Sequence, residues 1–186
     1  MIGSPRRREG AMATHDFGPV DALDAEAIGP PGKRTFRIRA WKDQATASLW
    51  LEKQQLLALS LALRQVIAQV SQNTQPKPSP TQSFPEHPTV DMKLGRLALG
   101  RDEESDRLIL WAHEAGSSEE APPNFSCHVA WEQALAFCEQ AEAVCAAGRP
   151  ICYLCGEPID PAGHVCVRSN GHSRQEIPPT ESGESP

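Results

Sequence analysis

The sequence contains no apolar run long enough to cross a bilayer and no excess of positive charge. A membrane-spanning helix needs about 20 consecutive apolar residues, and the apolar runs here are far shorter. Residues 1–10 are basic but lack the apolar segment of a secretory signal. With 18 Lys and Arg against 24 Asp and Glu, the formal net charge of −6 disfavours broad electrostatic binding to nucleic acid or to anionic membrane. These absences predict a cytoplasmic protein.

The common catalytic and nucleotide-binding motifs are also missing. The sequence has no G-x-S-x-G elbow, no H-E-x-x-H pair, no phosphate-binding glycine loop and no dinucleotide fingerprint. His113, His128 and Asp91 are candidate acid-base groups, but their spacing does not join them. The sequence therefore leans away from an enzyme. The alternative is a hydrolase or transferase that acts on a phosphorylated small molecule between the two halves of the chain.

Half of the six cysteines lie in one short segment towards the C-terminus. Cys152 and Cys155 form a C-x2-C pair, and His164 and Cys166 form an H-x-C pair. Tetrahedral zinc takes four N or S ligands, and two close pairs joined by a short loop supply them at low cost in chain entropy. Gly156 suits the turn of a zinc knuckle, in which backbone amides point at a thiolate. Three thiolates and one imidazole leave no open position, so the predicted zinc site is structural.

Two other interpretations of this segment remain open from the spacing alone. His172 is an alternative to His164 as the fourth ligand. A thioredoxin-like redox pair at Cys152 and Cys155 requires a helix that starts at the first cysteine, whereas the prolines within residues 157–161 prevent one.

Three basic residues lie in or beside this segment: Arg149, Arg168 and Arg174. They are either ordinary surface charge or a patch for an anion, an RNA or a protein partner.

Hydrophobic periodicity predicts an α+β domain over residues 16–147, made of two β-β-β-α repeats that form an antiparallel sheet packed by two helices. The repeats span residues 16–72 and 90–147, and a proline-rich linker over residues 73–89 joins them. The predicted strands are 22–28, 35–40, 45–51, 92–99, 107–112 and 125–130, and the predicted helices are 53–70 and 131–147. A zinc knuckle over residues 148–174 follows, with disordered extensions at 1–15 and 175–186.

Five segments carry a resemblance to a known family: Asp16-Phe-Gly-Pro-Val-Asp21, Ile28-Gly-x-x-Gly-x-Arg-Thr-Phe36, Leu51-Glu-Lys-Gln54, Ala147-Gly-Arg-Pro150 and the cysteine segment through Asn170-Gly171. They resemble an uncharacterised bacterial family catalogued as domain of unknown function 3090. In that family's pattern the two cysteines, the histidine and the third cysteine recur, which implies Cys152, Cys155, His164 and Cys166 as the ligands. His172 stands where the family usually has an aromatic residue, which weakens it as a ligand.

These observations together predict a zinc-binding protein that works as a non-enzymatic protein-interaction module. Its partner is a protein of unknown identity. A zinc knuckle that binds RNA is a second alternative to the enzyme, although the negative net charge disfavours nucleic acid.

Overall fold

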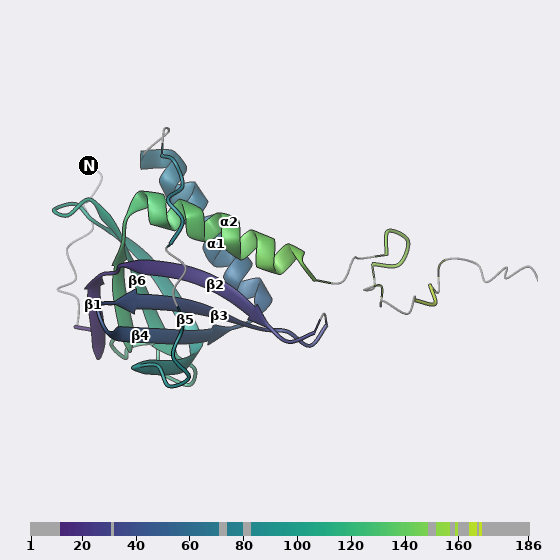
Figure 1. Ribbon diagram of the computed structural model, residues 1–186, viewed down its shortest axis with the longest axis horizontal. Coiled ribbons are helices and arrows are strands. Elements are labelled where there is room, and N and C mark those ends of the chain that lie inside the picture. The colour runs from purple at the N-terminus through teal and green to yellow at the C-terminus, as the bar shows by residue number, and fades with distance from the viewer. Residues whose placement is uncertain are drawn as a thin grey trace, which may run out of the picture. The chain divides into compact units, whose positions relative to one another are not determined.

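The computed structural model describes residues 12–30, 32–70, 74–79, 83–148, 152–156, 159, 164–166 and 168. The chain divides into two compact units, Met1–Ala147 and Gly148–Pro186. The first unit contains one sheet and two helices (Figure 1). Its elements in order are β1 (His15–Pro19), β2 (Ala22–Ile28), β3 (Thr35–Lys42), β4 (Ala45–Leu51), α1 (Lys53–Val70), β5 (Val90–Asp102), β6 (Arg107–Glu114), β7 (Phe125–Val129) and α2 (Trp131–Ala146).

The predicted α+β class is confirmed, and after β1 the elements follow as three strands and a helix, twice. The strands form one sheet in the order β1-β7-β6-β5-β4-β3-β2. The sheet is mixed, which corrects the expectation of an antiparallel one, because β4 pairs with β5 and β1 pairs with β7 in parallel. Since α1 lies between β4 and β5, a helical crossover returns the chain to the end of the sheet where β4 began. The internal repeat itself remains a prediction.

The core lies between the inner face of the sheet and the two helices. Alternate strand residues point inwards, as Leu108, Leu110 and Ala112 do in β6, and the helices contribute residues spaced three and four apart. Cys138 and Cys145 of α2 pack in this core as small hydrophobic residues, since both are buried. The buried helix residues are Leu56, Leu59, Ser60, Leu63 and Ile67 in α1, and Trp131, Ala134, Phe137, Cys138, Ala141 and Cys145 in α2.

The two edge strands of the sheet, β1 and β2, follow each other in the sequence and are separated only by Val20 and Asp21. The backbone N–H of Val20 donates to the carbonyl of His128 in β7 at 3.0 Å, and the next amide, that of Asp21, donates to Trp41 in β3 at 2.8 Å. Two consecutive amides therefore bind strands at opposite sides of the sheet order. The side chain of Gln133 in α2 donates to the carbonyl of Asp21 at 3.0 Å, so the start of α2 is tied to the same junction.

Two described residues of the proline-rich segment, Lys77 and Ser79, form hydrogen bonds with the rest of the domain. The amide of Lys77 donates to the carbonyl of Glu132 at 3.0 Å. The hydroxyl of Ser79 accepts from the amide of Leu23 at 3.0 Å and donates to its carbonyl at 2.8 Å, which satisfies both backbone groups on the open side of β2. Because an edge strand offers unpaired backbone groups to other chains, these contacts also cover an exposed edge.

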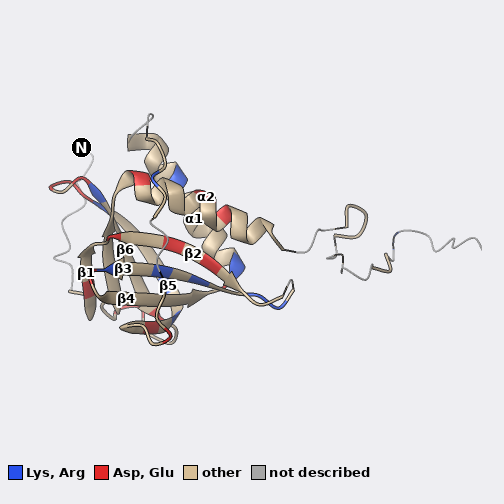
Figure 2. Ribbon diagram, in the orientation of Figure 1, with Lys and Arg blue, Asp and Glu red and all other residues tan. Residues whose placement is uncertain are grey.

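The same segment covers part of the outer face of the sheet. Phe84 packs edge-on against Trp41, with ring centroids 5.2 Å apart, and the guanidinium carbon of Arg37 lies 4.8 Å from the centroid of the Phe84 ring. Arg37 and Arg39 lie on the face of β3 that points away from the core, where charged side chains are ordinarily in water. Their side chains are instead only 17% exposed, since they form ion pairs with Glu26 and Asp24 of β2. In Figure 2 the basic positions of β3 are blue and the acidic positions of the neighbouring β2 are red. Arg39 binds both carboxylate oxygens of Asp24, at 2.7 and 2.8 Å.

We expect Ser79→Ala to lower the free energy of unfolding by about 1–3 kcal/mol, because it leaves two backbone groups of Leu23 without their partner. Ser83→Ala, in the same segment but at an exposed position, is the matched control and should change stability by no more than about 0.5 kcal/mol. Urea unfolding of both variants measures the difference. Equal stability of the two variants would show that the segment does not hold the edge of β2.

Within the part of the chain that the structure describes, neither α1 nor α2 combines the length and the hydropathy that a membrane-spanning helix requires.

Candidate metal centre

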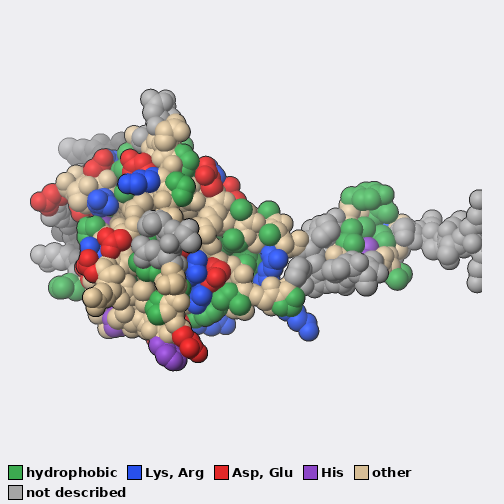
Figure 3. Space-filling view, in the orientation of Figure 1, with side chains coloured by type: hydrophobic (Ala, Val, Ile, Leu, Met, Phe, Trp, Pro, Cys, Tyr) green, Lys and Arg blue, Asp and Glu red, His purple; other side chains and the backbone are tan. Residues whose placement is uncertain are grey.

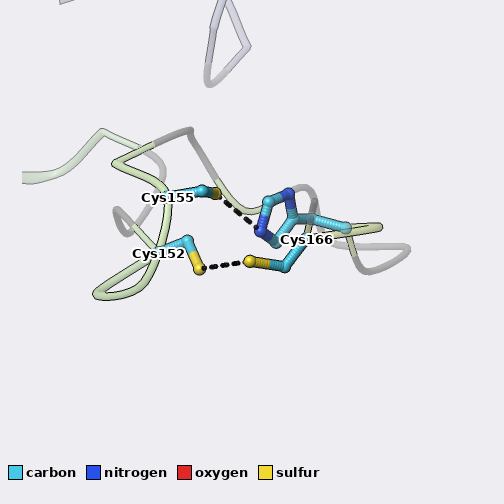
Figure 4. A group of neighbouring side chains, drawn as sticks. Cys152, Cys155 and Cys166 are labelled. Atoms are coloured by element: carbon cyan, nitrogen blue, oxygen red, sulfur yellow. Dashed lines mark hydrogen bonds between the residues drawn. The ribbon is translucent and has the colours of Figure 1, made fainter. Parts of the chain in front are cut away.

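Four side chains of the second unit converge on one point. The ligand atoms of Cys152, Cys155, His164 and Cys166 all lie within 4.8 Å of one another. The sulfurs of Cys152 and Cys166 are 3.7 Å apart, and the Cys155 sulfur is 3.4 Å from Nε2 of His164 (Figure 4). At Zn–S distances of about 2.3 Å, two sulfurs on a regular tetrahedron lie about 3.8 Å apart, and a sulfur and a nitrogen somewhat closer. Both separations therefore fit a shared tetrahedral metal ion, while 3.7 Å is far longer than the ~2.05 Å of a disulfide.

A tight turn holds the first cysteine pair. The amide of Gly156 donates to the carbonyl of Cys152 at 2.8 Å, and Gly156 has a φ of 78°, a conformation that glycine adopts without strain. The backbone amides of Cys155 and Leu154 donate to the Cys152 sulfur and, with His164, lower the pKa of that thiol to about 6. The turn thus favours the thiolate, which is the form of cysteine that binds metals.

The histidine of the group is held by the same sulfurs. Hydrogen bonds to Cys152 and then Cys166 raise the pKa of His164. The shift favours a protonated imidazole beside the cysteine sulfurs, and a metal ion that binds such ligands displaces their protons. The donor set therefore favours positive charge at this point.

The structure gathers the four residues that the spacing and the resemblance had singled out. His172, the alternative fourth ligand, lies outside the described residues, as do Arg149 and Arg174 of the predicted basic patch. Arg168 donates from Nη1 to the carbonyl of Leu154 at 3.2 Å, so this arginine contacts the first cysteine turn.

A family model for proteins of unknown function, DUF3090, matches residues 15–166 of the chain. The match covers most of the 186 residues, from the first residue of β1 to the last candidate ligand. The chain belongs to the DUF3090 family. No curated protein and no solved structure matches it. The resemblance found in the sequence is thereby confirmed, and the DUF3090 match includes the whole Cys3His group but not His172.

The candidate metal centre of this DUF3090 protein is bordered by exposed apolar side chains. Tyr153 is 91% exposed and Val165 is 94% exposed, while Leu154 is 37% exposed. Hydrophobic side chains are visible on the surface of this unit in Figure 3. Sequence reasoning assigned these residues no role, although the pattern held a signal. Tyr153 and Leu154 lie between the first two candidate ligands in the sequence, and Val165 lies between the other two.

The predicted acid-base groups are not brought together. His113 in β6 pairs with Arg96 across the strands, whereas His128 in β7 pairs with Ile109, four residues earlier in β6. The positions of the two histidines along the sheet therefore differ by four strand residues, or about 13 Å. Asp91 lies in β5 and accepts a hydrogen bond from the indole N–H of Trp50 at 2.6 Å. Each of the three groups belongs to a separate part of the DUF3090 fold.

Each histidine has its own partner in the DUF3090 domain. Nη2 of Arg96 lies 3.0 Å from Nδ1 of His113, and Nη1 donates to the carbonyl of Glu119 at 3.0 Å. Nδ1 of His128 lies 3.7 Å from a carboxylate oxygen of Asp102. These contacts explain both histidines by their structural roles, and none of them supports the enzyme hypothesis.

We expect His113 to make the protein less stable in acid. Burial, and then the charge of Arg96, lowers the pKa of His113 below its ordinary value of 6.5, so the folded state favours the neutral ring. The stability that the neutral ring of His113 contributes is fully present above about pH 6.5 and is lost as the pH falls further through the lowered pKa. His113→Gln should therefore lose less stability than the wild type between about pH 7.5 and pH 5.5.

Thermal unfolding at several pH values measures this effect. The control is His87→Gln, which removes a histidine at an exposed position of the same domain. Identical pH profiles for His113→Gln and the wild type would contradict the prediction.

Proposed function

We propose that this chain is a zinc-binding, non-enzymatic protein whose Cys3His centre shapes a recognition surface for a protein partner in the cytoplasm. The observation that supports it best is the convergence of four donor atoms within 4.8 Å. Cys152, Cys155, His164 and Cys166 would hold the metal, which would fix the two turns relative to each other.

Zinc is the metal that this donor set favours. Thiolates are soft ligands that suit zinc, whereas magnesium and calcium prefer oxygen ligands. Three thiolates and one imidazole complete a tetrahedron and leave no position for water or substrate, which is typical of structural zinc and not of catalytic zinc. A reducing compartment keeps the cysteines available as ligands, which agrees with a cytoplasmic location.

The role in protein binding rests on the side chains around the centre. Tyr153 and Val165 are both more than nine-tenths exposed, at 91% and 94%. Exposing two large side chains on such a small unit leaves apolar area in water that a partner would remove. Tyrosine is enriched at protein interfaces because it combines apolar area with one hydrogen-bonding group.

Metal analysis of the purified protein tests the metal site. We expect one zinc per chain, and Co²⁺ substitution should give the absorption of a tetrahedral thiolate site. Cys145→Ala is the matched control, since Cys145 is a buried cysteine of α2 outside the group, and this variant should keep its zinc. Protein without zinc, in which Cys152 and Cys155 cycle as a disulfide, would refute the proposal.

Site-specific photo-crosslinking tests the recognition surface. A photoreactive amino acid at position 153 should give a discrete protein adduct in cells, and the adduct should disappear when a ligand cysteine is replaced. The same amino acid at position 12, where Met12 is 85% exposed, serves as the control. Equal adducts from both positions, or an adduct with RNA at position 153, would rule out a protein partner at this surface.

A further inference from the structure

The outer side of α1 carries no charge over most of its length. From Gln54 to Val70, every exposed residue is Leu, Ala, Gln or Val. The only charged residue in that stretch, Arg64, turns towards α2, where its Nε donates to Glu142 at 2.6 Å. Most of α1 is accordingly tan in Figure 2. Surface helices normally place charged residues towards water, and 23% of this chain is charged, so the neutral side of α1 calls for a physical explanation.

Two leucines form a ridge on this neutral side. Leu57 is 39% exposed and Leu61 is 60% exposed. They lie four residues apart and therefore neighbour each other on the helix surface. Leu61 is among the most exposed large apolar residues of the first unit, which makes it an unfavourable side chain to leave in water.

A hollow lies next to the ridge. Its volume is ≈ 360 Å³, and it is lined by Gln55, Ala58, Leu59 and Ala62 of α1 with Leu97 and Leu99 of β5. Ala58 and Ala62 are also one helical turn apart, so their short side chains leave a groove along α1 where the leucines form a ridge. Leu97 and Leu99 form the apolar wall of the hollow on the sheet side and pack against the core.

A ridge and a hollow of the same chemistry on one face make that face complementary to itself. In a two-fold dimer the same patch meets on both subunits, so each ridge faces the other subunit's hollow. Packing a ridge of one helix into the groove of another is the ordinary mode of helix association. An 18-residue helix is about 27 Å long, comparable to the side of a patch of ~800 Å², which a stable interface buries on each partner.

Charge also favours a second copy as the occupant. Each chain carries a formal charge of −6, so two copies repel each other at most relative orientations. The neutral side of α1 allows close approach without placing like charges together. A strongly charged partner would instead lose the hydration of its charges against α1 and gain no ion pair in return. We infer that α1 is a homodimer interface, in which Leu57 and Leu61 of each copy pack into the hollow between α1 and β5 of the other.

Sedimentation velocity over a concentration series tests the interface on the full-length, zinc-loaded protein. We expect the wild type to dimerise and Leu61→Glu to weaken the dimer by at least ~100-fold, since two buried leucines are lost and two charges are introduced. Met12→Glu makes the same kind of change at a residue that is 85% exposed and should leave the dimer intact. Circular dichroism should show that both variants remain folded.

A pair of complementary variants tests the ridge-and-hollow arrangement itself. Leu61→Ala removes the ridge, and Ala62→Leu fills the hollow, so each variant alone should be mainly monomeric. In an equimolar mixture, Leu61 of the second variant meets the open hollow of the first, and the filled hollow meets the shortened side chain. The mixture should therefore form heterodimers.

Three outcomes would overturn the inference: a wild type that stays monomeric up to about 1 mM, a Leu61→Glu protein that dimerises as well as the wild type, or a mixture with no heterodimer. None of them depends on zinc binding or on the surface around Tyr153, so the proposed function is tested separately.

Discussion

Cys152→Ser is expected to bind zinc at least ~100-fold more weakly than the wild type. A structural zinc site of four ligands is worth about 10–16 kcal/mol, so one ligand accounts for about 3 kcal/mol on average, a factor of ~100 in affinity. Cys152 should contribute more than this average to zinc affinity, because two backbone amides already stabilise its thiolate. Competition with a chromophoric chelator measures the affinity.

Two comparisons make this prediction sharper. Cys166→Ser removes the sulfur that lies 3.7 Å from that of Cys152 and should weaken zinc binding to a similar extent. Cys145→Ala should bind zinc as the wild type does. Wild-type affinity in Cys152→Ser would mean that the metal, if any, is held elsewhere in the chain.

Phe137→Ala is expected to lower the free energy of unfolding by about 3–5 kcal/mol. Phe137 lies in α2, is 0% exposed and belongs to the core cluster between the helices and the sheet. Truncating a buried phenylalanine removes transfer free energy and leaves a cavity. Domains of this size are stabilised by about 5–15 kcal/mol in total, so the variant should approach the limit of folding.

Urea unfolding with the milder Phe137→Leu as a control gives the measurement. The control keeps most of the apolar volume and should cost less than Phe137→Ala. A loss below about 1 kcal/mol for Phe137→Ala would show that α2 does not pack as described.

The elements that depend on local pattern were predictable from the sequence. The bounds of α1 agree with the predicted 53–70, because its leucines recur at helical spacing and proline-rich sequence follows. The strands β3 and β4 follow from alternating residues on both sides of a short turn at Asp43, whose φ is 51°. Neighbouring residues decide these features, so one segment is sufficient to infer them.

β1 was not predictable, and the predicted disordered extension 1–15 overlaps it at His15. Gly18, with a φ of 55°, and Pro19 interrupt the alternation expected of a strand. The strand exists because it pairs with β7, in a register that matches His15 with Phe125. The parallel pairing of β4 with β5 depends in the same way on segments far apart in the sequence. No local pattern encodes such a pairing.

The candidate metal centre was easier to predict than its surroundings. Its ligands come in pairs two and three residues apart, so the chain brings each pair together without help from the rest of the fold. The proline-rich segment shows the opposite case. Its composition predicts a linker, but the contacts of Ser79 and Phe84 depend on where β2 and β3 lie.

The junction at Val20 and Asp21 has a consequence for synthesis on the ribosome. β1 emerges before β7, and about 110 residues separate the paired positions of Asp16 and Ser126. At about 5–20 residues per second, β1 must wait roughly 5–20 s for its partner strand. Until β7 arrives, no strand of the finished sheet can pair with β1, so the nascent chain offers an unpaired segment to chaperones. Completion of the sheet is thus one of the last steps of folding, although it involves one of the first strands to be made.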